Sequence, residues 1–327
     1  MTASSPTRIV ALALAGALVA ASLAEAAPAA AAPPRPNTFC AGTADINAAL
    51  ITSAVNLGSC AIQSRRIVLM RSDGKSGPAV DVPPPGRTIG NETLTTSGEY
   101  SLRVTNNDGM VSVTTEVPGA VRTLAPATDA ACGEGAYNLE GGRWTRTLKW
   151  FYNSASAGRA GLSASATLAD IRAGNTNMST GQNNCGYATG TFSSTGAYQG
   201  TTSRYANINS SAQCTGNFPD GQNTDSWGPF DSSAAGTLAV TCYTYSGGAM
   251  TESDTYFGSN VGMVDSFPAS CSGKYDLQSV STHEWGHAFG LAHETSGTAE
   301  VMYPYSYPCA LRRHLGKGDY NGMNSMY

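Results

Sequence analysis

Apolar and polar residues alternate over several short stretches in the first third of the chain, and this pattern predicts β-strands. Residues 67–70 form a compact apolar run, while residues 100–104 and 110–117 alternate with a period of two. Turn residues such as Asn107-Asp108-Gly109 separate these runs. We therefore expect a small β-rich N-terminal module over residues 27–125. It is either a pro-segment that is removed or a permanent domain.

The remaining residues, 126–327, mix helix and strand patterns and predict an α+β domain. Strands are expected at residues 146–152, 236–245 and 250–257, and a helix at residues 160–172. Residues 175–232 are rich in Asn, Ser, Thr and Gly, so they are expected to form a long irregular segment.

Another helix is expected from Asp276 to about Phe289. The Asp276 carboxylate can accept the unpaired backbone N–H groups of a first turn, and the apolar residues that follow supply a buried face. Gly290 comes where this helix must end, because glycine adopts the left-handed conformation at low cost.

Three of the four histidines in the chain fall in or directly after this helix, in the pattern H-E-x-x-H-x-x-G-x-x-H. His283 and His287 are four residues apart, so their imidazoles lie on one face of the helix, and His293 can approach after the turn at Gly290. Three protein ligands suit a catalytic Zn²⁺ site with one open position. Glu284 is placed to act as the general base on a zinc-activated water. A lone histidine on a helix is usually a packed or solvated residue, but this pattern is far more specific.

At these residues the sequence resembles the metzincin zinc peptidases, and in particular the matrixins. Residues 301–304 (VMYP) resemble the Met-turn of that group, and residues 315–327 resemble the C-terminal helix of matrixins. The resemblance implies a zincin fold with a twisted mixed sheet, an active-site helix and a C-terminal helix. It also implies a secreted endopeptidase that binds an extended protein or peptide substrate along an edge strand, for which residues 250–257 are the candidate.

Two other classes of function stay open. One is a secreted adhesion or binding protein that keeps zinc only structurally, and the other is a zinc hydrolase acting on non-peptide substrates. Trp285 is expected to pack on the back of the helix. Asp254 and Glu252 could bind calcium, but we expect them to be exposed strand charges, so calcium ligands stay unassigned.

The N-terminal residues and the composition add to this picture. A single Arg8 followed by an apolar run and the Ala24-Glu25-Ala26 site indicates a signal peptide over residues 1–26, with a membrane anchor as the alternative. Eight cysteines in an exported chain predict disulfides, with Cys40 paired to Cys60, and secretion to the extracellular space. The net charge of −4 gives no reason to expect nucleic acid as a partner, and no stable membrane association is expected. The excess of Arg over Lys, with abundant Ala and Gly, indicates a GC-rich bacterial source, and the resemblance implies a secreted member of actinobacterial type. The oligomeric state stays open.

Overall fold

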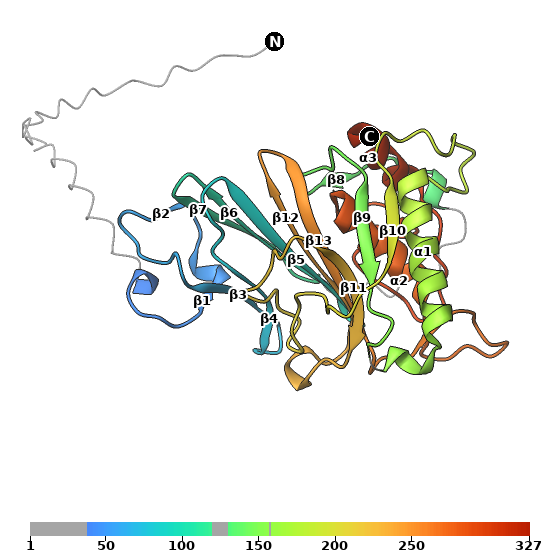
Figure 1. Cartoon of the computed structure of the whole chain (residues 1–327), viewed down its shortest axis with the longest axis horizontal. Coiled ribbons are helices and arrows are strands. Elements are labelled where there is room, and N and C mark those ends of the chain that lie inside the picture. The colour runs from blue at the N-terminus through green and yellow to red at the C-terminus, as the bar shows by residue number, and fades with distance from the viewer. Residues whose placement is uncertain (1–37, 120–129, 157) are drawn as a thin grey trace, which may run out of the picture. The chain divides into compact units, whose positions relative to one another are not determined.

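The computed structural model describes residues 38–119, 130–156 and 158–327. The predicted signal peptide and the predicted boundary near residue 125 lie outside these ranges. A nine-stranded mixed sheet runs through the described part in the order β10-β9-β11-β13-β12-β5-β6-β7-β2 (Figure 1). Its strands are β2 Val55–Asn56, β5 Arg87–Thr95, β6 Gly98–Asn107, β7 Met110–Glu116, β9 Leu148–Tyr152, β10 Gly196–Thr201, β11 Asn223–Gly228, β12 Thr237–Ser246 and β13 Ala249–Gly258.

The sheet has a parallel half and an antiparallel half, and β12 stands where they meet. Strands β10, β9, β11 and β13 pair in parallel, whereas β12 pairs antiparallel with both β13 and β5. The strands of the N-terminal segment therefore continue the sheet of the C-terminal part. Three small sheets accompany it: β1 Ile46–Asn47 with β3 Arg66–Met70 and β4 Ser76–Asp81, β14 Met263–Val264 with β15 Tyr275–Asp276, and β16 Leu291–Ala292 with β8 Asn138–Leu139.

Two apolar cores are associated with the large sheet. One contains residues of the three α-helices of the described part, which lie to the right in Figure 1: α1 Ala164–Thr180, α2 Leu277–Phe289 and α3 Lys317–Met326. The other joins the N-terminal strands to the loops before and after β11, with Ile67 and Leu102 in the same cluster as Ile208 and Phe218. This explains the alternation in β6, because Tyr100, Leu102 and Val104 all belong to the second core.

Helix α2 has the bounds that the sequence predicts, and α3 lies within residues 315–327, whereas α1 begins later and is longer than expected. Its first turn is capped by the Ser163 hydroxyl, which accepts the N–H of Ala166, and it continues to Thr180 through residues that were expected to be irregular. Residues 175–232 also contain β10 and β11, so that expectation is wrong. Strand β11 has the polar sequence NTDSWG, yet it is hydrogen-bonded to strands on both sides, and pairing decides its conformation rather than composition.

The predicted hairpin of residues 236–245 and 250–257 is confirmed as β12 and β13. The expectation that residues 250–257 form an edge strand is wrong, because β13 lies inside the sheet between β11 and β12. Strand β12 follows β13 in the sheet and lies against α2. One edge of β12 pairs with β13, and the other edge pairs with β5.

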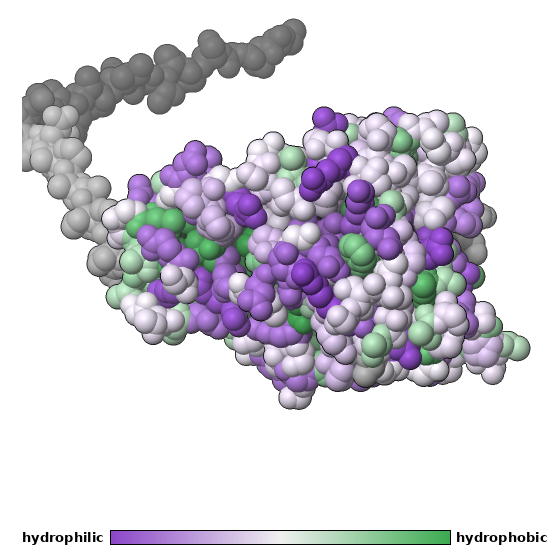
Figure 2. Space-filling view, in the orientation of Figure 1, coloured by the Kyte–Doolittle hydropathy of each residue, from purple (hydrophilic) through white to green (hydrophobic). Residues whose placement is uncertain are grey.

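Four disulfides use all eight cysteines. The predicted Cys40–Cys60 pair is confirmed, and the others are Cys132–Cys185, Cys214–Cys242 and Cys271–Cys309. Within the described ranges, no helix combines the length and apolar composition needed to cross a membrane. On the face shown in Figure 2, hydrophilic and weakly polar residues predominate, and hydrophobic residues gather most over the N-terminal strands at the left.

Candidate metal centre

Helix α2 carries two of the three histidines, and its ends are fixed by side chains and by glycine. Asp276 caps it by accepting the N–H of Ser279 at 2.8 Å, and Arg313 holds the same carboxylate through a contact of 2.5 Å. Gly290 ends it at φ 105°, where a Cβ atom would lie 2.2 Å from the carbonyl oxygen of Gly142. Glycine is therefore required at the turn that brings the chain back toward the helix.

The imidazoles of His283 and His287 are oriented by backbone carbonyl groups. His283 Nδ1 lies 2.6 Å from the oxygen of Val301, and His287 Nδ1 lies 3.0 Å from that of Leu291. A carbonyl can only accept, so each Nδ1 carries the proton and donates it. Each Nε2 is then turned toward the other ring, and a backbone carbonyl that fixes the second ring nitrogen is typical of metal-binding histidines. The two Nε2 atoms lie 3.2 Å apart.

His293 completes the group from the chain that follows the turn. Its ring centroid lies 5.7 Å from that of His283 and 4.8 Å from that of His287. Its Nδ1 lies 3.1 Å from a carboxylate oxygen of Glu116, at the end of β7, so this ring too can donate from Nδ1 and present Nε2 to the others. All three histidines are buried.

This donor set fits a zinc ion. Nitrogen ligands about 2.0–2.1 Å from a tetrahedral ion stand about 3.3 Å apart, which agrees with the 3.2 Å between the two helical Nε2 atoms. The ring nitrogens of the three histidines meet at one buried point, where the donor atoms lie within 4.8 Å of one another. A buried group of three imidazoles is the donor set typical of a catalytic zinc site.

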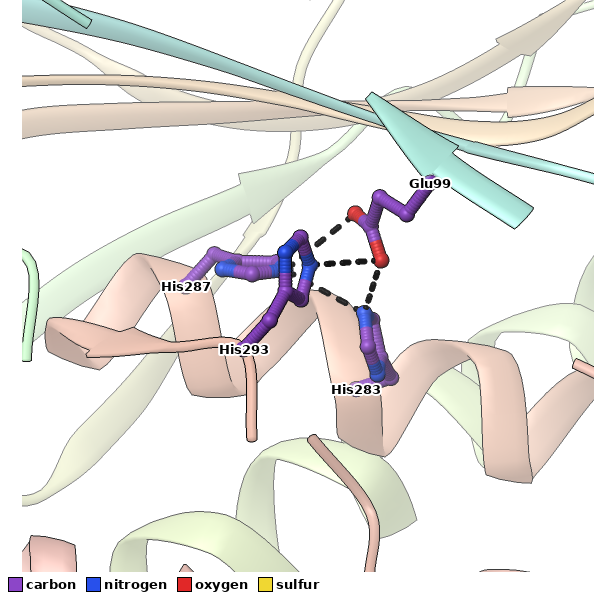
Figure 3. Close-up of side chains that lie close together, drawn as sticks. All are labelled: Glu99, His283, His287 and His293. Atoms are coloured by element: carbon purple, nitrogen blue, oxygen red, sulfur yellow. Dashed lines mark hydrogen bonds and ion pairs between the residues drawn. The ribbon is translucent and has the colours of Figure 1, made fainter. Parts of the chain in front are cut away.

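A carboxylate from the N-terminal segment also reaches this point (Figure 3). Glu99, the second residue of β6, places Oε2 2.6 Å from His283 Nε2 and 2.8 Å from His293 Nε2, while its Oε1 lies 3.2 Å from His287 Nε2. Burial alone would raise the pKa of Glu99, but the three neighbouring imidazoles outweigh it and hold this pKa well below its usual value. Conversely, Glu99 raises the pKa of His287 against the effect of burial.

Glu284 lies beside the first histidine and is also buried. Its Oε2 accepts the Thr241 hydroxyl of β12 at 2.5 Å, while Oε1 has no hydrogen-bond partner among the described residues. Burial, reinforced by the charge of Glu99, raises the pKa of Glu284 to about 8.

The residues beneath the histidines are packed tightly. Met302 lies against α2, where a Cβ atom on Gly286 would be 2.1 Å from the methionine sulfur. The buried carboxylate of Asp319 on α3 accepts the N–H groups of Val301 and Met302 at 2.7 and 3.0 Å. Since the Val301 carbonyl also orients His283, α3 supports the position of that ligand through the backbone.

Comparison with known proteins agrees with this geometry. The matrixin family model matches residues 201–327, which contain the three histidines, Glu284 and Met302. The chain contains a matrixin-like domain. Over 111 residues it is 36% identical to matrix metalloproteinase-20 of Homo sapiens, an alignment that spans 34% of this chain and 21% of the human protein. The predicted resemblance to matrixin-like metzincins is confirmed, and the mixed sheet with few helices agrees with the α+β fold that was expected.

The structure brings the predicted site residues of the matrixin-like domain together. His283, His287 and His293 converge through their rings, and Glu284 is buried close enough to be affected electrostatically by His287 and His293. Trp285 is buried on the other side of α2, where its ring packs against Trp150 and its N–H donates to the Ile171 carbonyl.

Asp254 and Glu252 differ from expectation, because both are buried rather than exposed. Asp254 accepts the backbone N–H groups of Asn207 and Thr224, and Glu252 accepts that of Asp220 at 2.7 Å. These hydrogen bonds hold the loop residues Asn207 and Asp220, and Thr224 of β11, against β13. Among the described residues, neither belongs to a group of side chains arranged to hold a metal.

Sequence reasoning missed Glu99, Glu116 and Thr241. None lies within a hundred residues of the third histidine except Thr241, and no local motif marks them. The alternation in residues 100–104 puts Glu99 on the face of β6 opposite the apolar residues, where a charged side chain is expected to meet solvent. The sequence therefore gives no sign that Glu99 is buried beside the histidines.

Proposed function

We propose that the protein is a secreted zinc-dependent endopeptidase in which His283, His287 and His293 hold the metal and Glu284 is the general base. The observation that carries this proposal is the convergence of three Nε2 atoms whose Nδ1 atoms are all engaged elsewhere. The match to the matrixin family supports it independently.

Each residue has a separable task in this proposal. Zinc, when bound, acts as a Lewis acid that polarises the scissile carbonyl and activates the attacking water. Glu284 takes up the proton from the attacking water and passes it to the leaving amine. Thr241 donates to Glu284 Oε2 and so holds the carboxylate in one rotamer, which leaves Oε1 as the atom that moves the proton.

The substrate in this proposal is an extended protein or peptide segment. Strand β12 carries Thr241 and lies against α2, so a peptide pairing with β12 would bring its backbone past Glu284 and the histidines. Export through residues 1–26 and a division of the chain near residue 125 belong to the same proposal. The disulfides support an extracellular location, since such bonds persist in oxidising compartments.

Hydrolysis of an unfolded protein such as casein tests this proposal. The full chain should be assayed before and after proteolysis between Glu116 and Cys132 and separation of the fragments, alongside Glu284→Gln, with zinc measured in each preparation. We expect cleavage that a chelator stops, and a Glu284→Gln variant that keeps its zinc but loses at least about a thousandfold in activity. Zinc-loaded protein that cleaves nothing in either form would favour the alternatives, a zinc-binding adhesion protein or a non-peptide hydrolase.

A further inference from the structure

The edge of β12 where a peptide substrate would pair is already paired. Strand β5 runs antiparallel along the whole of β12, in a register that extends from Thr237 opposite Thr95 to Ser246 opposite Arg87. Without β5, β12 would be the outer strand of the group β10-β9-β11-β13-β12. The N-terminal segment therefore takes the place that an added strand would occupy.

The turn between β5 and β6 carries Glu99 to the three histidines (Figure 3). Gly98 forms this turn at φ 114°, and a Cβ atom there would lie 2.6 Å from the ring of Tyr305. The Thr95 hydroxyl donates to the Gly98 carbonyl at 2.6 Å and fixes the turn. Glycine is therefore needed at position 98 for the hairpin to pack against Tyr305. This packing places the next residue, Glu99, at the metal centre.

Further contacts hold the hairpin in this position. Arg103 of β6 forms an ion pair of 2.6 Å with the buried Glu140, which also accepts the hydroxyl of Tyr243 from β12. Glu116 at the end of β7 lies at hydrogen-bonding distance from His293. The N-terminal segment therefore contacts the centre through two carboxylates. Glu99 lies beside the Nε2 atoms of the three histidines, and Glu116 lies beside Nδ1 of His293.

We propose that Glu99 is the fourth protein ligand of the metal and that the chain, with its β5–β6 hairpin docked on β12, is a latent form of the enzyme. A carboxylate oxygen is a normal zinc ligand, and four protein ligands leave no open position for water. This inference rests on the proposed function. For Glu99 to bind the metal as a fourth ligand, its carboxylate has to move away from the Nε2 atoms by only about half an ångström. Its oxygen then reaches the distance from those nitrogens that tetrahedral ligands have.

The disulfide pattern is consistent with release of the hairpin. Cys40–Cys60 lies within the N-terminal segment, and the other three bonds join residues beyond 131, so none crosses between the two parts. A single backbone cut between Glu116 and Cys132 would leave only non-covalent contacts. Because the second core is shared by both parts, they should stay associated after the cut until they are separated or the N-terminal part is degraded.

Cobalt substitution of the full chain tests the ligand assignment. Co²⁺ would be bound to wild type, Glu99→Ala and Glu99→Gln, with Asp81→Asn as the control for a carboxylate of the same segment outside the site. We expect the visible spectrum to change in both Glu99 variants, and acetohydroxamate to bind them at least tenfold more tightly than wild type. Asp81→Asn should match wild type in both. The Gln variant keeps the shape of the side chain, so it remains informative if the Ala variant does not fold.

Identical spectra and hydroxamate affinities in all four proteins would overturn the ligand assignment while leaving the proposed function intact. Failure of every protein to bind cobalt would instead overturn the proposed function itself. Latency is tested by a specific protease site engineered between Glu116 and Cys132, so that no disulfide joins the two fragments. Casein hydrolysis should rise at least tenfold once the cut fragments are separated, and an uncut chain as active as the separated one would refute latency.

Discussion

Asp319 should be one of the most sensitive positions in the molecule although it lies away from the histidines. Its Oδ2 accepts the N–H groups of Val301 at 2.7 Å and Gly316 at 2.9 Å, and its Oδ1 accepts that of Met302 at 3.0 Å. In Asp319→Asn, only one acceptor oxygen remains. The asparagine oxygen can keep the hydrogen bonds of the oxygen that it replaces. Its NH2 group then faces a backbone N–H, and these two donors cannot form a hydrogen bond.

The expected loss follows from these three bonds. A hydrogen bond to a charged group contributes about 1.5–3 kcal/mol, and a neutral one about 1 kcal/mol. The better orientation of asparagine loses one charged bond and converts the other two to neutral ones, each conversion costing about 1 kcal/mol. The free energy of unfolding should therefore fall by about 3–5 kcal/mol. Zinc affinity should fall as well, because the Val301 carbonyl that orients His283 belongs to the displaced segment.

Urea unfolding of zinc-loaded and chelator-treated protein measures this loss. Asp265→Asn is the matched control, since Asp265 is exposed and its replacement should change the free energy of unfolding by less than about 0.5 kcal/mol. If Asp319→Asn loses less than about 1 kcal/mol in both metal states, the supporting role of this carboxylate is refuted.

Three further predictions concern the surroundings of the centre. Gly286→Ala should lower the free energy of unfolding by about 1–3 kcal/mol, because the new methyl group meets the sulfur of Met302; an unchanged melting temperature would contradict this packing. Burial raises the pKa of Glu300 to about 9, so ionising this carboxyl disfavours the folded state. The free energy of unfolding of wild type should therefore fall relative to that of Glu300→Gln as the pH rises from about 5 to 9. Urea unfolding that gives the same difference between the two proteins at both pH values would contradict this. Replacing both Cys271 and Cys309 with alanine opens a loop of 38 residues and should reduce stability by about 2–4 kcal/mol in the same assay, whereas a loss below about 1 kcal/mol would show that the bond contributes little.

Local chemistry explains which parts of this fold the sequence predicts. Helix α2 has an aspartate cap, an apolar face and a terminal glycine, and its observed bounds agree with those signals. Strand β11 has none of the usual strand signals, because its conformation comes from neighbours that are distant in sequence. Composition alone therefore gives a wrong result there.

The candidate site divides in the same way. The three histidines and Glu284 are predictable because one helix and one turn fix their spacing. Glu99 is 184 residues away from His283, and it reaches the histidines only because β5 joins the sheet next to β12. No periodicity within either segment encodes that pairing, so a residue contributed by it can be found only in the folded chain.

Zinc content of single histidine variants tests the central claim most directly. Metal per chain would be measured after dialysis for wild type, His283→Ala, His287→Ala and His293→Ala, with His314→Ala as the control because that histidine is exposed and contacts Asn184 instead. The account predicts one zinc in wild type and in His314→Ala, and at least tenfold weaker zinc binding in each of the other three. Equal zinc content in all five proteins would show that the metal is held elsewhere and would contradict the assignment of this centre.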